Sequence, residues 1–467
     1  MALLKKLTLL TLPIFLSACG NDDLDPNEIH SPDTYEFSSQ TDPAASSSVD
    51  YLEATTHLVL IKELQHLIGS PELQTVGTTQ GKDAVIALLN KVYLDGTQYL
   101  STTNIYNNQS EPTPISGVSS TLTKVQTDFS SLDSNINLKN KLPGVHADLI
   151  YRGNEDASLG NLIGWNILHL DDEDTLLDTL IQNWFEKIAL LAVDGDPTTK
   201  YIKTGLDYQN LVGSLLVGAI PYYQATQTLL NTTNGLIAEN SSQTSYTDLQ
   251  HNWDLAFGYF GAHRQYKLQS KQLNATQFEF DSNDDNQLDL LSELNFTYAS
   301  NAASLDFTSP INTVTFSIDI NQAFLNGRQI INDNLNNTTT NNGDFHKALI
   351  EQANIITGSW ERVIAAQLIH YLNLNATDVL YYGQIESYDN RYAKNWAFVK
   401  GYALALQFNP NSIVTEDELI DLHILIGQQP EVRTDPSRLR AYSNNLLIAR
   451  NKLESIYSFT NSDVLAW

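Results

Sequence analysis

The hydrophobic residues of this chain recur every three or four positions over long stretches, which is the spacing of one face of an α-helix. The clearest stripe comprises Trp360, Val363, Ile364, Gln367, Leu368, Tyr371 and Leu372. Similar stripes occupy residues 52–68, 176–192, 211–230 and 441–456. Alternating patterns typical of β-strands are few and short. The pattern therefore predicts an all-α protein, built as one large helical bundle or as two fused bundles.

Three polar residues accompany the clearest stripe. Glu361 and Arg362 directly follow Trp360, at the expected start of the helix, and we expect both to lie on its surface. His370 stands at the edge of the stripe, so we expect a hydrogen-bonded histidine on the border between core and surface.

The first residues have the pattern of a secretory signal. Lys5 and Lys6 precede an apolar run over residues 7–16, which is too short to cross a bilayer as a helix. The following Leu-Ser-Ala-Cys tetrad, ending at Cys19, resembles a bacterial lipobox and implies cleavage before Cys19 and lipid on its sulfur. Gly20 replaces the aspartate of an inner-membrane retention signal, so we expect an outer-membrane lipoprotein in the cell envelope. The alternative is a plain secretory signal with a chance cysteine.

The chain beyond the signal peptide (residues 1–18) divides into two parts by composition. Residues 19–48 are rich in Asn, Asp, Pro and Ser and are expected to form a flexible tether. Residues 49–467 are expected to form the helical domain, and the polar stretch 236–244 is the best candidate for a boundary between two halves, 49–240 and 241–467.

Composition and charge restrict the partners. The 467 residues include 54 acidic and 26 basic side chains, for a formal net charge of -28. Because nucleic-acid affinity comes largely from Lys and Arg, a chain with this acidic excess is not expected to bind nucleic acid. The single cysteine excludes intrachain disulfides and Cys-rich zinc sites, so any metal must be held by oxygen or histidine. The expected partners are the membrane, through the lipid at Cys19, and an unidentified small molecule, metal or envelope protein.

An acidic segment that begins at Asp281 resembles the calcium loop of an EF-hand. Oxygen-bearing side chains stand at positions 1, 3, 5 and 9 of the loop, and position 8 is apolar, as a loop that turns inward around a hard cation requires. Two positions differ, because Asn286 replaces the usual glycine and the glutamate comes at position 13. The predicted ligands of a structural calcium ion are Asp281, Asn283, Asp285, Gln287, Asp289 and Glu293. The alternative is a solvated acidic turn that caps the next helix.

A second candidate site lies on a helix that should start at Thr247, where Thr247 and Gln250 form a capping box. On this helix His251 and Asp254 fall opposite the apolar face, next to Gly258. An imidazole and a carboxylate three positions apart can share a metal ion or a substrate, or can form an ordinary polar pair.

No known nucleotide-binding or hydrolase signature is present: HExxH, GxSxG and GxGxxG are all missing from the sequence. Two functions remain as alternatives, a binding or accessory protein of the envelope and a periplasmic metal-dependent hydrolase that uses His251 and Asp254. Glycan binding through exposed Tyr and Trp is a third interpretation, which no motif supports.

Several segments together resemble an uncharacterised family of bacterial envelope lipoproteins, over roughly residues 35–430. They are residues 35–37, 49–51, 251–261, 290–293, 327–328 and 400–410. That family is similar to the imelysin-like helical proteins, which are associated with iron uptake and, in older naming, with peptidases. The resemblance implies an imelysin-like bundle and a link to iron or metal uptake, with an unidentified transition metal. In place of the GxHxxE motif of imelysin-like proteins this chain has His251 and Asp254. Where the lipoprotein family tends to have His-Trp-x-Glu, it has residues 395–398, Asn-Trp-Ala-Phe.

Overall fold

The fold was analysed in a computed structural model, which describes residues 29–96, 99, 124–125, 136–143, 162–165, 176–195, 205–241, 244–290, 292–337 and 343–467. Cys19 and the signal peptide lie outside these residues. The described chain is all-α, as the hydrophobic pattern predicts. In the described part of the chain, no helix is both long and apolar enough for a bilayer span.

The helices follow the predicted stripes closely. The first group is α1 (Leu52–Gly69), α2 (Pro71–Gln80), α3 (Lys82–Asp95), the turn η2 (Lys139–Lys141) and α5 (Leu176–Asp194). The central group is α7 (Tyr208–Val217), the π-helical segments η4 (Gly218–Tyr222) and η5 (Gln224–Leu229), η6 (Gly235–Ile237), α8 (Asp248–Phe260), η7 (Tyr266–Leu268), α9 (Lys271–Thr276), α10 (Thr297–Thr308) and α11 (Phe316–Asp333). The last group is α12 (Asp344–Asp378), η8 (Val379–Tyr381), α13 (Glu386–Ala405), η9 (Leu406–Phe408), α14 (Glu416–Ile426), α15 (Pro436–Tyr457) and α16 (Asn461–Ala466). Two strands of two residues each, β1 (Lys124–Val125) and β2 (Gln287–Leu288), pair in parallel.

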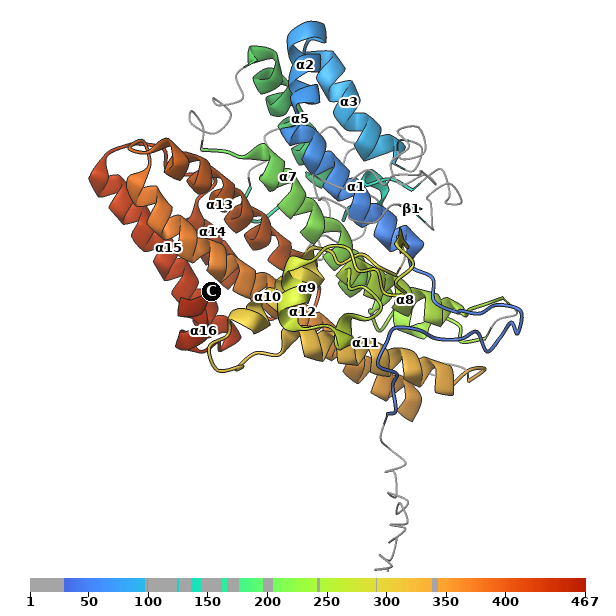
Figure 1. Cartoon of the computed structure of the whole chain (residues 1–467). Helices are drawn as coiled ribbons and strands as arrows, with labels where there is room; N and C mark the ends of the chain where they lie inside the picture. The colour runs from blue at the N-terminus through green and yellow to red at the C-terminus, as the bar shows by residue number, and fades with distance from the viewer. Residues whose placement is uncertain are drawn as a thin grey trace, which may run out of the picture.

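The long helix α12 organises the C-terminal part of the fold. It packs against α11, α13 and α15, while α1 packs against α3, α7 and α8 (Figure 1). Trp360, near the middle of α12, is fully buried among the rings of Tyr222, Phe260 and Tyr298. Buried side chains from both predicted halves, 49–240 and 241–467, join in one continuous core. The division into halves stays a prediction.

The N-terminal segment is packed where the sequence predicts a flexible tether. Residues 35–48, here called the strap, run beside α8 and α11 (Figure 1). Tyr35 and Phe37 are buried, and the Tyr35 ring stacks on Phe257 of α8 with centroids 3.7 Å apart. Of the flexible tether that we predicted over residues 19–48, the part from Tyr35 onward is therefore packed on the helical body.

Glu361 is buried in the interior of α12, so the expectation that it lies on the surface is wrong. The helix begins at Asp344, not near Trp360, and the face that bears Glu361 is covered by distant segments. Its carboxylate accepts hydrogen bonds from the hydroxyl of Tyr457 (2.9 Å) and the backbone amide of Ile413 (2.7 Å). Further donors are Asn409, Ser412 and Val414. Glu361 thus joins α12 to the segment that follows η9 and to the end of α15.

Replacement of Glu361 by Ala should lower the free energy of unfolding by about 3 kcal/mol or more, because each buried donor left without an acceptor costs about 1–3 kcal/mol. Urea denaturation measures this loss. Glu361→Gln, which keeps one acceptor oxygen, should lose less. Glu351→Ala, at an exposed position of the same helix, is the matched control and should change stability by less than about 0.5 kcal/mol. A loss below about 1 kcal/mol for Glu361→Ala would contradict the role assigned to this carboxylate.

Candidate functional site

The acidic loop at 281–293 is folded around the carboxylate of Asp281. This carboxylate accepts hydrogen bonds from the backbone amides of Asp285 (3.1 Å) and Asn286 (2.9 Å). Asn286, with φ at 58°, takes the left-handed conformation that glycine provides in an EF-hand loop. Asn283 Nδ2 donates to Asp285 at 3.2 Å, so the first, third and fifth positions of the loop lie together. Gln287 contributes its backbone to β2.

Glu293 connects the start of the loop to its end by hydrogen bonds. Its carboxylate is buried and accepts hydrogen bonds from the amide (2.8 Å) and the hydroxyl (2.7 Å) of Ser282 and from the amide of Asp289 (2.9 Å). Burial raises the pKa of Glu293, and these hydrogen bonds oppose the shift. Among the described residues, no group of three or more His, Cys, Asp or Glu side chains is arranged to hold a metal ion. The calcium site over Asp281, Asn283, Asp285, Gln287, Asp289 and Glu293 therefore stays a prediction.

His251 and Asp254 lie on α8, which begins at the predicted capping box. His251 is partly exposed and stacks on Tyr246, with ring centroids 4.8 Å apart. Asp254 is fully buried, so the polar face that bears it packs on other elements and does not face solvent. The helix α8 is covered on this side because α1 packs closely on Gly258, where an added Cβ would lie 3.0 Å from the Cβ of Ala54.

The partner of Asp254 is Arg328 of α11. The guanidinium Nε lies 2.8 Å from Asp254 Oδ1, both side chains are 0% exposed, and the Tyr35 hydroxyl donates to the same oxygen at 2.8 Å. Arg328 also donates to the Ser48 hydroxyl at 2.7 Å and lies over the Phe37 ring. Burial raises the pKa of Asp254, and Arg328 opposes the shift. A metal ion on this carboxylate would have to displace a positive charge, so we do not propose the hydrolase that would use His251 and Asp254.

A cleft of about 320 Å³ lies where α1, α7, α9, α10, α12 and α13 meet. One side is formed by Tyr371, Phe398 and Tyr402, here called the aromatic wall, whose ring planes lie within 21° of parallel. Tyr371 and Phe398 are partly exposed, with centroids 4.5 Å apart. Amide and hydroxyl groups line the other sides, among them Asn295 and Asn301. The sequence pattern does not reveal this cleft, because its lining residues come from six helices that are far apart in the chain.

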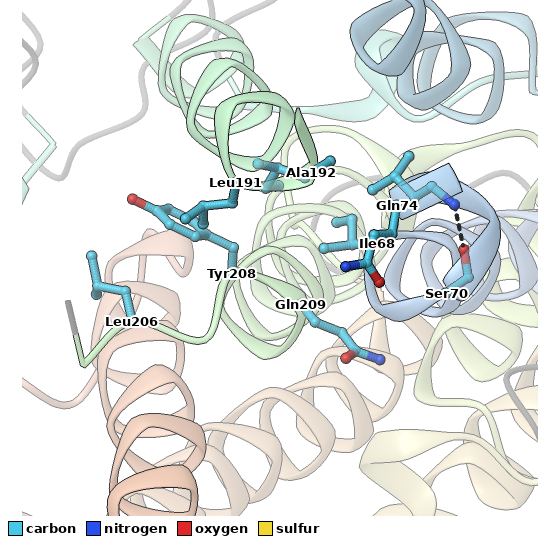
Figure 2. Close-up of a pocket in the computed structure, with 10 residues that line it drawn as sticks. Ile68, Ser70, Gln74, Leu191, Ala192, Leu206, Tyr208 and Gln209 are labelled. Carbon is cyan, nitrogen blue, oxygen red and sulfur yellow. Dashed lines mark hydrogen bonds between the residues drawn. The ribbon is translucent and has the colours of Figure 1, made fainter. Parts of the chain in front are cut away.

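Two other hollows are less suited to a ligand. A small apolar pocket between the α1–α2 turn, α5 and α7 (Figure 2) has a volume of about 20 Å³, which is room for about one water molecule. A groove of about 630 Å³ along α11 and α12 is lined mainly by polar side chains such as Gln322 and Asn326, and no aromatic ring is among its described lining residues. The cleft is therefore the better candidate for a binding site.

Residues 400–402, which are consecutive on α13, make contacts in three different parts of the structure. An added Cβ at Gly401 would lie 2.0 Å from Ser214 Oγ, so this glycine lets α13 approach α7. Tyr402 belongs to the aromatic wall. Lys400 is buried on another side of α13, where it donates to the Gly427 carbonyl at 2.8 Å, and burial lowers its pKa to about 7.

The buried pair of Asp254 and Arg328 generates a stability prediction. Asp254→Asn should lower the free energy of unfolding by about 3–5 kcal/mol, because it leaves the Arg328 charge buried without its counter-ion. The double variant Asp254→Leu with Arg328→Met should lose less than the sum of the two single changes. Urea denaturation of each variant checks both results. His251→Ala, on the same helix, is the control and should cost less than about 1 kcal/mol; an equal loss for His251→Ala and Asp254→Asn would contradict this role of the pair.

Comparison with known proteins places most of these elements in one family. The family model described as Domain of unknown function (DUF4856) matches residues 186–419, half of the chain. The matched region contains α8, the acidic loop, Arg328 and the aromatic wall. Neither a curated protein nor a solved structure matches the chain. The chain therefore belongs to the DUF4856 family, as a member of a domain family of unknown function.

Proposed function

We propose that this chain is a lipid-anchored binding protein of the bacterial cell envelope, and that it holds a small ligand in the cleft. The observation that carries the proposal is the cleft itself. Its volume of about 320 Å³ lies in the range of small-molecule sites, roughly 300–1,000 Å³. An apolar ring surface on one side and a few polar groups on the others is the usual composition of such sites.

The groups that line the cleft favour recognition over catalysis. They are rings, amides, hydroxyls and the ammonium group of Lys62, all of which hold a ligand by contact and hydrogen bonding. His251 and Asp254 lie elsewhere, on α8. The proposal therefore assigns the chain a binding or accessory role.

The anchor in this proposal is Cys19, through the Leu-Ser-Ala-Cys tetrad. Acyl chains on its sulfur and on its new amino group would hold the protein stably on the outer membrane, since two or more chains anchor where one does not. The 16 Cα–Cα steps from Cys19 to Tyr35 could span at most about 55 Å. Because the strap is packed on α8 and α11, the helical body would stay within that reach of the membrane.

The mature protein should begin at Cys19, with a lipid on the sulfur and a further acyl chain on the amino group. Mass spectrometry of the N-terminal peptide checks this, and the intact protein should enter the detergent phase of a Triton X-114 separation. A variant that combines an ordinary secretory signal with Cys19→Ser should enter the aqueous phase. An unmodified Cys19, or a mature N-terminus at another residue, would contradict the anchor.

The proposal includes a structural calcium ion in the acidic loop. Support comes from the left-handed Asn286 and from the Asp281 carboxylate, which already organises the turn. Carboxylate and amide oxygens are the ligands that Ca²⁺ prefers. Such an ion would offset the repulsion among the carboxylates of Asp281, Asp285 and Asp289.

Calcium should stabilise the protein by about 2.7 kcal/mol when its concentration is 100 times the dissociation constant. Thermal unfolding in CaCl2 and in EDTA measures this, and the double variant Asp281→Ala with Asp285→Ala should not respond. The control Glu351→Ala with Glu386→Ala removes two exposed acidic side chains that do not belong to the loop and should respond like the parent protein. A parent protein whose melting temperature is the same in both solutions has no such site.

The resemblance to imelysin-like proteins extends the proposal to iron or other metal uptake. This link rests on the resemblance, because Arg328 occupies the Asp254 carboxylate. Elemental analysis of the purified protein tests it: iron or zinc that is lost in His251→Ala would support the link, and calcium as the sole bound metal would count against it.

A further inference from the structure

We infer that the ligand of the cleft is a neutral saccharide, an inference that rests on the binding function proposed above. It follows from three features of the cleft, which are the shape of the aromatic wall, the kind of polar groups and the scarcity of charge.

The aromatic wall suits the face of a sugar ring. Its three ring planes lie within 21° of parallel, and Tyr371 and Phe398, which are partly exposed, stack on each other with centroids 4.5 Å apart, so this stack offers a sugar its outer ring face and the ring edges. A pyranose ring presents a row of C–H bonds on one face, and the electron-rich face of an aromatic ring attracts the positive ends of such bonds. Burial of this apolar patch is the main favourable contribution that a sugar can gain from a protein surface.

The polar groups of the cleft match hydroxyl groups. A sugar hydroxyl both donates and accepts a hydrogen bond, and a side-chain amide offers both functions on one group. Asn301 is held in place because its Nδ2 donates to the Tyr402 hydroxyl at 2.9 Å. Asn295, which is 1% exposed, donates to the Asn274 carbonyl at 2.6 Å and so fixes the wall of the cleft next to Ser300. Ser300, which accepts from Asn295 at 3.2 Å, adds a hydroxyl to the same side.

The charges around the cleft disfavour an ionic ligand. Among the described residues that line it, none is acidic, and Lys62 is the one that can carry a charge. A cationic ligand would therefore be desolvated without a counter-ion, which is costly. An anionic ligand would find one cation, Lys62, whose charged form is disfavoured because burial lowers its pKa, in a chain with a net charge of -28. A neutral ligand avoids both costs, and Lys62 can still donate a hydrogen bond to a hydroxyl oxygen.

The test is isothermal titration of the full-length protein, in a detergent whose head group is not a sugar. The probes are neutral monosaccharides and their short oligomers, with glucuronate, phenylalanine and neutral dipeptides as ligands of other classes. At least one neutral saccharide should bind with a Kd below about 10 mM, while glucuronate should bind at least tenfold more weakly than glucose-type sugars. The variants Tyr371→Leu and Phe398→Leu keep apolar volume but remove one ring each, and each should weaken saccharide binding at least tenfold.

The matched control is Phe307→Leu, because Phe307 is an aromatic residue that is 53% exposed and does not line the cleft. It should bind the saccharide like the parent protein, and circular dichroism should show that all three variants are folded. If a dipeptide or phenylalanine binds instead, and the two wall variants lose that binding, the cleft is a ligand site and only the saccharide inference is wrong. If no probe binds, or if binding is equal in all variants, the saccharide inference and the proposed role of the cleft both fail.

Discussion

The buried ion pair of Asp254 and Arg328 is the interaction on which the N-terminal part of the structure depends. Two fully buried charges, 2.8 Å apart, connect α8 to α11, and the hydrogen bonds to Tyr35 and Ser48 add both ends of the strap. A pair of this kind contributes little net stability by itself, because desolvation offsets the attraction. Its effect is specificity, since an α8 that packed without Arg328 would bury an uncompensated carboxylate.

The same helices relate the strap to the cleft. One face of α1 packs on α8, next to the strap, and α1 also packs on α7, whose residues line the cleft. The cleft is also lined by α13, which packs on α12. On α12, Glu361 is a further buried carboxylate, and its hydrogen-bond donors are all neutral. The N-terminal segment, which leads to the proposed lipid anchor, is thus part of the packed body that contains the proposed binding site. Ligand recognition would then occur on the same packed body whose N-terminal segment leads to the membrane.

Local features of this fold could be predicted from the sequence, because they depend on neighbours in the chain. The stripe at 52–68 became α1, and the capping box at Thr247 starts α8. The left-handed turn at Asn286 also follows from residue type. In contrast, the burial of Asp254 and Glu361 could not be predicted because their partners are remote: Tyr35 is 219 positions from Asp254, and Tyr457 is 96 positions from Glu361. The cleft could not be predicted for the same reason, since each of six helices contributes one to three lining residues and these have no common spacing in the sequence.

Hydrogen exchange of the strap measures directly whether the packed body of the protein begins before α1. The backbone amide of Tyr35 donates to the Arg264 carbonyl, and that of Ser48 donates to the Phe37 carbonyl, each at 2.9 Å. Mass spectrometry with deuterium should find these two amides protected to about the same degree as the amides in the middle of α8. If both amides exchange at the rate of an unstructured peptide while α8 stays protected, the strap is a free tether and the packed body does not begin before α1.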